Sequence, residues 1–180
     1  ERTHRTLIVD GDPEAATGGP ARTTENLMAA FSALLHPAPE RVLEVGFGAG
    51  EHLVWQAAHH PHVGIIGCEP YINGVARALG KIEDEGITNA RVIPDDARLL
   101  MDKLPDACLN RAFVLFPDPW PKTRHAIRRF IGPSNLDRLS RLLGDDAILR
   151  VASDHKPYVR WTLLHAASHP DFELLDEGPS

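Results

Sequence analysis

Residues 41–52 read RVLEVGFGAGEH, and this stretch decides the fold class. Arg41–Val45 predicts a short strand, Gly46–Gly50 a glycine-rich turn, and Glu51–His60 a helix that Pro61 ends. A glycine-rich turn between a strand and a helix lets a ligand approach the backbone closely at the N-terminus of the helix. The stretch therefore predicts a strand–turn–helix unit that binds a ligand.

Strands and helices are expected to alternate along the rest of the chain. The further strands are predicted at 63–68, 90–93, 109–116, 147–153 and 172–175. The further helices are predicted at 72–85, 97–103, 135–143 and 157–169. Strands that alternate with helices predict an α/β fold with a doubly wound, mostly parallel sheet of Rossmann-like type. This pattern does not predict the order of the strands in the sheet.

The N-terminal region has a different composition. Residues 1–22 mix charged residues with Gly, Pro and Thr, and contain one short apolar run at Leu7–Val9. They predict a flexible arm with one strand-like stretch. A helix is expected to begin near Thr23 or Thr24, either of which is a good N-cap. We therefore expect residues 23–180 to form a single domain.

The composition bounds the class of protein. The 180 residues, 43% of them hydrophobic, suffice for one domain with a proper core. The net charge of −6 argues against a protein that coats nucleic acid non-specifically, but it leaves room for a local basic patch. No apolar stretch approaches the roughly 20 residues of a membrane span, so no membrane partner is expected.

Cysteine and histidine usage indicates the compartment and the metal content. Cys68 and Cys108 lie on or beside apolar segments, which predicts buried, reduced thiols in a cytoplasmic protein. His59, His60 and His62 cluster around a proline, with no cysteine nearby and no partner motif. We interpret them as surface histidines and expect no metal.

Three acidic residues follow or flank the first three predicted strands. Glu44 precedes the glycine-rich turn, Glu69 ends the second strand, and Asp96 follows the third. An acid in the position of Glu69 commonly holds ribose hydroxyls, whereas carboxylates near the turn repel phosphate. The glycine spacing is G-x-G-x-G and differs from the G-x-G-x-x-G of dinucleotide sites. The set favours a nucleoside that carries positive charge and no phosphate, namely S-adenosylmethionine (SAM), over a dinucleotide.

A proline-rich loop follows the fourth strand, where residues 112–122 read AFVLFPDPWPK. Its prolines stiffen the loop and end the strand. Asp118, Trp120 and Lys122 therefore lie on a rigid loop at the ligand-binding edge of the sheet. They fit a flat, polar ligand such as a nucleobase; the alternative is a surface turn with Trp120 packed underneath. For Trp120 itself, packing is slightly favoured over stacking on a base.

Four cations follow within eight residues, with no acid among them: Lys122, Arg124, Arg128 and Arg129. Such a run is usually a solvated charged face. Its position directly after the proline-rich loop favours a contact with phosphate groups instead.

Five motifs resemble the bacterial tRNA (guanine-N7-)-methyltransferase family. They are Leu43–His52, Gly67–Pro70, Asp95–Ala97, Leu115–Lys122 and Ser153–His155, and the resemblance runs from about Arg41 to Ser180. The Phe-Pro-Asp-Pro-Trp-Pro-Lys string is its most specific part. The resemblance implies the SAM-dependent methyltransferase fold and methylation of guanosine N7 in tRNA, in the variable loop. We expect a monomer or a homodimer with tRNA as its partner.

The resemblance also assigns roles to single residues. It implies cofactor-binding positions at Glu44, Gly46, Gly48, Glu69, Asp96 and Asp118. Asp118 is also the residue that the family uses at its catalytic centre. Lys122 and Asp154 match substrate-binding positions, and the segment with Arg124, Arg128 and Arg129 matches one that touches RNA.

Two elements of the family are not found in the sequence, and they keep alternatives open. Residues 1–40 contain no Gly-Arg-Arg segment, and the family's C-terminal tail with its Thr-x-x-Glu element is absent after Ser180. One alternative is a non-catalytic RNA-binding module with a degenerate methyltransferase fold. Another is a SAM-dependent methyltransferase with a non-RNA substrate. An NAD-dependent oxidoreductase is disfavoured by the glycine spacing.

Overall fold

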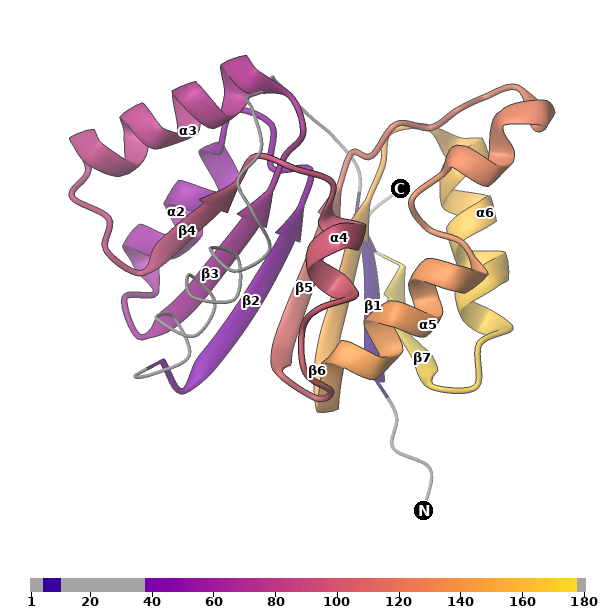
Figure 1. Cartoon of the computed structure of the whole chain (residues 1–180). Helices are drawn as coiled ribbons and strands as arrows, with labels where there is room; N and C mark the ends of the chain where they lie inside the picture. The colour runs from indigo at the N-terminus through magenta and orange to yellow at the C-terminus, as the bar shows by residue number, and fades with distance from the viewer. Residues whose placement is uncertain (1–4, 11–37, 178–180) are drawn as a thin grey trace. The chain divides into compact units, whose positions relative to one another are not determined.

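The computed structural model describes residues 5–10 and 38–177 of the chain (Figure 1). These residues fall into two compact units. Unit 1 combines residues 1–13 with 105–180, and unit 2 comprises residues 14–104.

Unit 2 contains three parallel strands in the order β4-β3-β2. The strands are β2 (Glu40–Val45), β3 (Val63–Cys68) and β4 (Ala90–Ile93). The helices are α2 (Glu51–His59), α3 (Ile72–Asp84) and α4 (Ala97–Met101). All six residues of β3 are buried, as expected for a central strand covered on both faces. This burial explains why its sequence, VGIIGC, is apolar without alternation.

Close packing of α2 on β3 depends on Gly67. A Cβ atom at Gly67 would lie 2.2 Å from Leu53 Cδ1 of α2 and 2.5 Å from the Phe47 ring. The absence of a side chain there lets the glycine-rich turn and α2 lie directly on the strand. The turn is thereby held against the carboxyl end of β3, where Glu69 follows.

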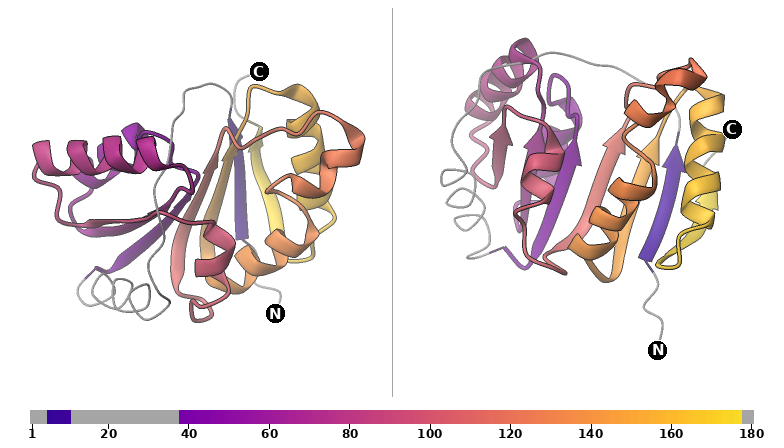
Figure 2. Two further views of the ribbon diagram at one scale, coloured as in Figure 1. Left: turned by 45° about the horizontal axis from the view of Figure 1, so that its top comes forward. Right: turned by 45° about the vertical axis from the view of Figure 1, so that its right-hand side comes forward.

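Unit 1 contains four parallel strands in the order β5-β6-β1-β7 (Figure 2). The strands are β1 (Arg5–Asp10), β5 (Leu109–Leu115), β6 (Leu143–Ala152) and β7 (Phe172–Glu177). The helices are α5 (Pro133–Leu142), α6 (Lys156–Ala167) and a 3-10 segment, η1 (Thr123–Arg128). Helix α5 contacts β6 and α6 contacts β7.

Strand β1 includes the apolar run at residues 7–9 that the sequence indicated as strand-like. It pairs with β6 on one side and with β7 on the other. Residues 11–22 of the expected arm lie outside the described residues. The helix expected to begin at Thr23 or Thr24 lies outside them as well.

Strand β6 begins at Leu143, four residues before its predicted start at Ala147. The sequence Gly144-Asp145-Asp146 is typical of a turn, and Asp146 has a positive φ of 59°. The pairing with β5 jumps from Leu109↔Leu143 to Arg111↔Ile148, so the strand accommodates these residues as an irregularity. The predicted alternation of parallel strands and helices is otherwise confirmed, with helix ends shifted by one or two residues.

Candidate functional site

The glycine-rich turn of unit 2 adopts backbone conformations that favour glycine. Gly46, Gly48 and Gly50 have φ angles of 68°, 58° and 80°. Residues with side chains rarely adopt such angles. The Gly46 N–H donates to the carbonyl of Cys68 at 2.8 Å, which ties the turn to the end of β3. No atom would lie within 4 Å of a Cβ at Gly46. The backbone is therefore open to a ligand there.

Glu69 joins the glycine-rich turn to the start of α3. One carboxylate oxygen, Oε2, accepts from the Gly48 N–H at 3.1 Å, and Oε1 accepts from the Tyr71 N–H at 2.9 Å. The residue is only 9% exposed. A carboxylate offers about four acceptor positions, so it can bond backbone N–H groups and ribose hydroxyls together.

The Glu44 side chain is more deeply buried than is usual for a residue that lines an open ligand site. It is 2% exposed, and its Oε2 atom is 2.8 Å from His52 Nδ1. Burial raises the pKa of the Glu44 carboxyl, and the hydrogen bond from His52 opposes this shift. His52 Nε2 lies 3.1 Å from Gln56 Nε2. Glu44 thus connects β2 with α2 through a histidine that sequence reasoning did not single out.

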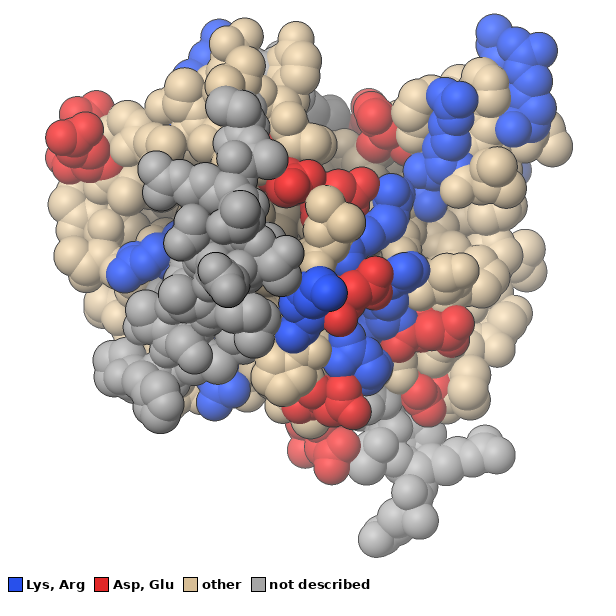
Figure 3. Space-filling model, in the orientation of Figure 1, with Lys and Arg blue, Asp and Glu red and all other residues tan. Residues whose placement is uncertain are grey.

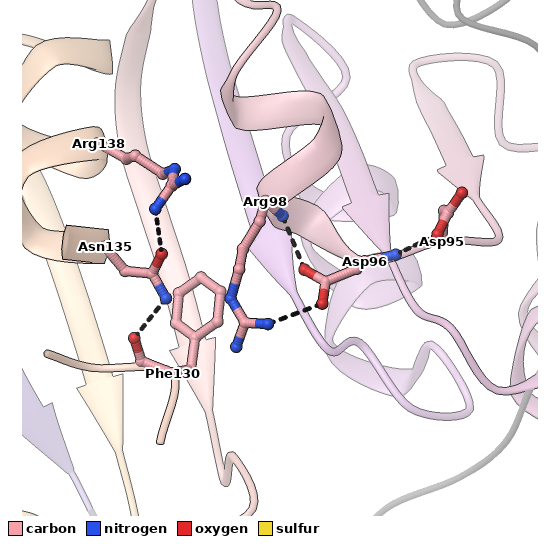
Figure 4. Close-up of polar contacts among 6 residues, drawn as sticks. All are labelled: Asp95, Asp96, Arg98, Phe130, Asn135 and Arg138. Atoms are coloured by element: carbon pink, nitrogen blue, oxygen red, sulfur yellow. Dashed lines mark hydrogen bonds and ion pairs between the residues drawn. The ribbon is translucent and has the colours of Figure 1, made fainter. Parts of the chain in front are cut away.

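Asp96 caps helix α4 and lies in a small polar network (Figure 4). Its Oδ1 atom accepts from the Arg98 N–H, and its Oδ2 atom accepts from Arg98 Nη1, both at 2.9 Å. Asp95 Oδ1 accepts from the Asp96 N–H at 2.8 Å. The Asp96 side chain remains 43% exposed, so it stays accessible at the carboxyl end of β4.

Lys81 of α3 is a further anchor of the glycine-rich turn. Its Nζ atom donates to the carbonyl of Ala49 at 3.0 Å and also pairs with Glu51. Lysine at this position gives no signal in the sequence, because Ala49 lies 32 residues away. Tertiary folding alone brings the two together.

In unit 1, two exposed carboxylates follow adjacent strands. Asp118 lies on the loop after β5 and Asp154 follows β6. Leu115 pairs with Ala152, so the two strands end at the same edge of the sheet. No hydrogen bond or ion pair joins Asp118 to another residue in the described part of the chain. Its carboxylate is therefore available to a ligand.

The proline-rich loop has two residues with positive φ. Phe116 has a φ of 48° and Trp120 a φ of 40°. Such angles are uncommon for bulky residues and persist only where the surroundings hold them. The Phe116 N–H donates to the carbonyl of Ala152 at 2.8 Å, which continues the pairing with β6. The loop that carries Asp118 thus has a fixed and strained backbone.

The basic residues divide into an exposed group and one half-buried residue, Arg129. Lys122, Arg124 and Arg128 are exposed on or beside η1, and Figure 3 shows Lys and Arg side chains over this part of the surface, at the upper right. The Arg128 guanidinium lies 4.9 Å from the centroid of the Trp120 ring. The His125 ring meets the same tryptophan edge-on at 5.8 Å. Trp120 is half-buried beside these groups.

Arg129 has different partners from its neighbours. Its Nε atom donates to the carbonyl of Pro119 at 2.9 Å, and Nη2 donates to that of Trp120 at 3.2 Å. Its guanidinium also lies 4.7 Å from the centroid of the Trp161 ring. All these partners belong to the protein itself.

The segment after η1 is anchored to α5 and α6. The Ile131 N–H donates to Tyr158 Oη at 3.0 Å, and Trp161 Nε1 donates to the Ile131 carbonyl at 2.6 Å. Asn135 Nδ2 donates to the Phe130 carbonyl at 2.7 Å (Figure 4). Burial raises the pKa of Tyr158 to about 12, so its hydroxyl stays protonated at neutral pH.

The pKa of His165, a residue next to Trp161, depends on the charge of Arg129. The His165 ring lies 4.1 Å from that of Trp161, and burial together with the charge of Arg129 lowers its pKa. Removing the cation in Arg129→Ala should therefore raise the His165 pKa in an NMR titration. Arg124→Ala, which removes an exposed cation, should leave it unchanged, and an unchanged His165 curve in Arg129→Ala would contradict the placement.

The lowered pKa of His165 also makes the free energy of unfolding depend on pH. The folded state binds the His165 proton less tightly than the unfolded state does. The contribution of His165 to the free energy of unfolding is therefore lost as the pH falls below its ordinary pKa of about 6.5.

Metal ligation, membrane insertion and thiol chemistry are three further features that the described residues bear on. Across residues 5–10 and 38–177, no group of three His, Cys, Asp or Glu side chains is arranged to hold a metal ion. No helix in the same ranges combines the length and apolar character that crossing a membrane requires. Cys68 and Cys108 are both buried, and burial raises the pKa of the Cys68 thiol.

Comparison with known proteins places the chain among methyltransferases. Residues 39–180 match the protein family described as "Putative methyltransferase". A protein named tRNA (guanine-N(7)-)-methyltransferase from Rhodospirillum rubrum is 55% identical over 144 residues, which are 80% of this chain and 56% of that relative. A protein of the same name from Paramagnetospirillum magneticum is 54% identical, over 79% of this chain and 61% of the relative. The chain thus spans about three fifths of these relatives, which bear out the resemblance of the five motifs.

Solved structures are similar in fold. The precorrin-6y C5,15-methyltransferase of Geobacter metallireducens has a TM-score of 0.58 at 16% identity and covers 88% of this chain and 78% of its own. The antibiotic-resistance methyltransferase Kmr has a TM-score of 0.52 at 20% identity, over 78% of this chain and 73% of its own. These likenesses confirm the predicted Rossmann-like fold class.

Proposed function

This chain belongs to the methyltransferase family whose model matches residues 39–180, and we propose that it transfers a methyl group from SAM to N7 of a guanosine in tRNA. The 55% identity to the Rhodospirillum rubrum protein of that activity carries the proposal. We place the guanosine in the variable loop, as the motif resemblance implies. The geometry within each unit supports the two binding roles that this reaction requires.

The residues of unit 2 fit SAM. The open backbone at Gly46 accommodates a ligand at close range, and Glu69 is oriented by the N–H groups of Gly48 and Tyr71 to accept ribose hydroxyls. Asp96 remains exposed enough to accept from the adenine amino group. Glu44 supports the cofactor site indirectly, because its contact with His52 holds helix α2 next to strand β2. When bound, SAM supplies an electrophilic methyl group on its sulfonium centre.

The residues of unit 1 fit guanine. N7 has a lone pair and no proton, so its methylation requires positioning of the reactants and no general base. Positive charge develops on the ring, and the exposed Asp118 carboxylate is suited to stabilise it. The same carboxylate can accept hydrogen bonds from guanine N1–H and the 2-amino group, which adenine lacks. We assign to Asp154 and Lys122 the role of orienting the base or sugar, as the motif resemblance implies.

The exposed cations Lys122, Arg124 and Arg128 fit the phosphate groups of tRNA. Phosphate contacts position a nucleic acid without reading its sequence. Their location beside the loop of Asp118 suits a protein that must present one base to one carboxylate. The proposed partner is therefore folded tRNA.

Nucleoside analysis tests the proposal directly. The chain is incubated with SAM and tRNA that lacks 7-methylguanosine, and the digested RNA is analysed by mass spectrometry. We expect 7-methylguanosine to appear, and Asp118→Ala serves as the matched negative control. A methyl group on another atom, or none despite measured SAM binding, would overturn the proposal. In the second case, retained tRNA binding would favour a non-catalytic RNA-binding module.

Glu69→Gln tests the cofactor role. The amide can accept a hydrogen bond through only one of its two terminal atoms, so it cannot bond both backbone N–H groups. Loss of charge-assisted hydrogen bonds worth about 1.5–3 kcal/mol each should weaken SAM binding on the order of 100-fold. Isothermal titration calorimetry provides the measurement. Glu83→Gln, an exposed acid on α3, is the control, and equal affinity in both variants would refute the role of Glu69.

A further inference from the structure

We propose that Arg129 is a positioning residue that holds the Asp118 loop in shape, rather than a contact with tRNA phosphate. This inference rests on the proposed function for its catalytic consequence. Its structural basis lies wholly within unit 1, in the contacts of Arg129 with Pro119, Trp120 and Trp161.

The guanidinium uses its fork to bond two consecutive carbonyls of the loop. Nε reaches the Pro119 carbonyl at 2.9 Å and Nη2 reaches the Trp120 carbonyl at 3.2 Å. A planar, rigid set of donors is suited to two acceptors held side by side. These carbonyls belong to the two residues that directly follow Asp118. Arg129 thus fixes the backbone next to the proposed catalytic carboxylate.

The guanidinium also contacts helix α6, through the ring of Trp161. Its centre lies 4.7 Å from the Trp161 ring centroid, and Trp161 Nε1 donates to the Ile131 carbonyl at 2.6 Å. The loop is thereby connected through Arg129 to helix α6. Cation–π contact of this kind orients an arginine without involving solvent or ligand.

The loop has a reason to need such support. Trp120 has a φ of 40°, and its carbonyl is one of the two that Arg129 bonds. A strained conformation persists only where its surroundings hold it in place. Prolines on both sides of Trp120 limit φ at their own positions but do not secure the φ of Trp120 itself. Arg129 supplies a contact that does.

Exposure separates Arg129 from the cations beside it. Arg124 and Arg128 are exposed, whereas Arg129 is half-buried and two of its donor nitrogens are engaged by the protein. Two of the five N–H donors of Arg129 are thus committed to carbonyls of the loop. The two roles therefore predict different results for a substitution that keeps the charge.

Arg129→Lys makes this distinction. Lysine keeps the positive charge that a phosphate contact needs, but its single ammonium lacks the fork and the flat face. We expect Arg129→Lys and Arg129→Ala each to lower kcat at least tenfold, with tRNA Kd and its salt dependence within twofold of the unsubstituted chain. Arg124→Ala should instead weaken tRNA binding and reduce the salt slope by about 0.7–0.9, one phosphate contact.

A second readout does not depend on methyl transfer. In the chain labelled with 5-fluorotryptophan, the ¹⁹F resonance of Trp120, assigned with Trp120→Phe, should shift and broaden in Arg129→Lys but not in Arg124→Lys. If the unsubstituted chain makes no 7-methylguanosine while this change is seen, the proposed function fails and the loop contact stands. A kcat and a Trp120 resonance unchanged in Arg129→Lys would overturn the inference. A salt slope lowered in Arg129→Ala as in Arg124→Ala would overturn it as well.

Discussion

Asp118→Ala is expected to lower kcat for methyl transfer to tRNA by about 10²–10³-fold, the loss typical when one group that stabilises transition-state charge is removed. SAM binding should persist at least in part, because the glycine-rich turn, Glu69 and Asp96, which are proposed to hold SAM, all belong to unit 2. The free energy of unfolding should change little. Asp118 is exposed and bonds no other described residue, so its removal leaves no buried group without a partner.

Asp118→Asn separates charge from hydrogen bonding. The amide oxygen can still accept from guanine, but it cannot stabilise the positive charge that develops on the ring. If charge stabilisation dominates, Asn should be nearly as inactive as Ala. If selectivity for guanine dominates, Asn should retain a large part of kcat.

The measurement is single-turnover formation of 7-methylguanosine at saturating SAM and tRNA. Asp145→Ala provides the matched control, since Asp145 is an exposed acid near the amino end of β6 in the same unit. Full activity in Asp118→Ala would remove Asp118 from the proposed catalytic centre. Equal loss in Asp145→Ala would show that the effect is not specific to the loop.

Gly50→Ala should destabilise unit 2 by about 2–5 kcal/mol, with the loss of SAM binding that follows from a displaced turn. Two effects add at this position. Gly50 has a φ of 80°, which an L side chain rarely adopts, and a Cβ there would lie 2.5 Å from Ala78 Cβ and 3.1 Å from Ala78 Cα on α3. The second atom belongs to the backbone, so the helix itself would have to shift.

Gly46→Ala is the control that isolates the conformational effect. Gly46 also has a positive φ, at 68°, but no atom lies within 4 Å of the position of its Cβ. It should therefore lose only about 1–2 kcal/mol, the strain of the left-handed conformation. Urea unfolding, monitored by circular dichroism, measures both variants. Equal destabilisation of the two would show that contact with α3 does not constrain the turn.

Long cationic side chains hold both loops that carry the proposed chemistry. Lys81 donates to the carbonyl of Ala49 in the glycine-rich turn, and Arg129 donates to two carbonyls of the Asp118 loop. Neither lysine nor arginine needs to touch a ligand to have this effect. A basic residue near a ligand-binding loop can therefore indicate support for the conformation of the loop as well as a negatively charged ligand.

The sequence by itself determined the fold class and showed that the candidate residues follow the carboxyl ends of strands. Apolar runs such as Val63–Cys68 indicate buried strands, because parallel strands are covered on both faces. The glycines of the turn and the prolines after Leu115 indicate loops, because they restrict or extend the backbone angles of single residues. These signals are local, and the positions of Glu69, Asp96 and Asp118 after strands follow from them.

The tertiary structure decided the partners of these residues. Glu44 proved to be buried against His52, Glu69 to bond Gly48 and Tyr71, and Arg129 to bond loop carbonyls. The sequence alone does not distinguish a charged side chain that contacts phosphate from one that faces solvent or bonds a backbone carbonyl. The partners of such a side chain depend on which segments packing brings within about 3 Å, and hydrogen bonds form only at that range. Contacts between segments that are distant along the chain carry no periodicity, so only the folded arrangement could show them.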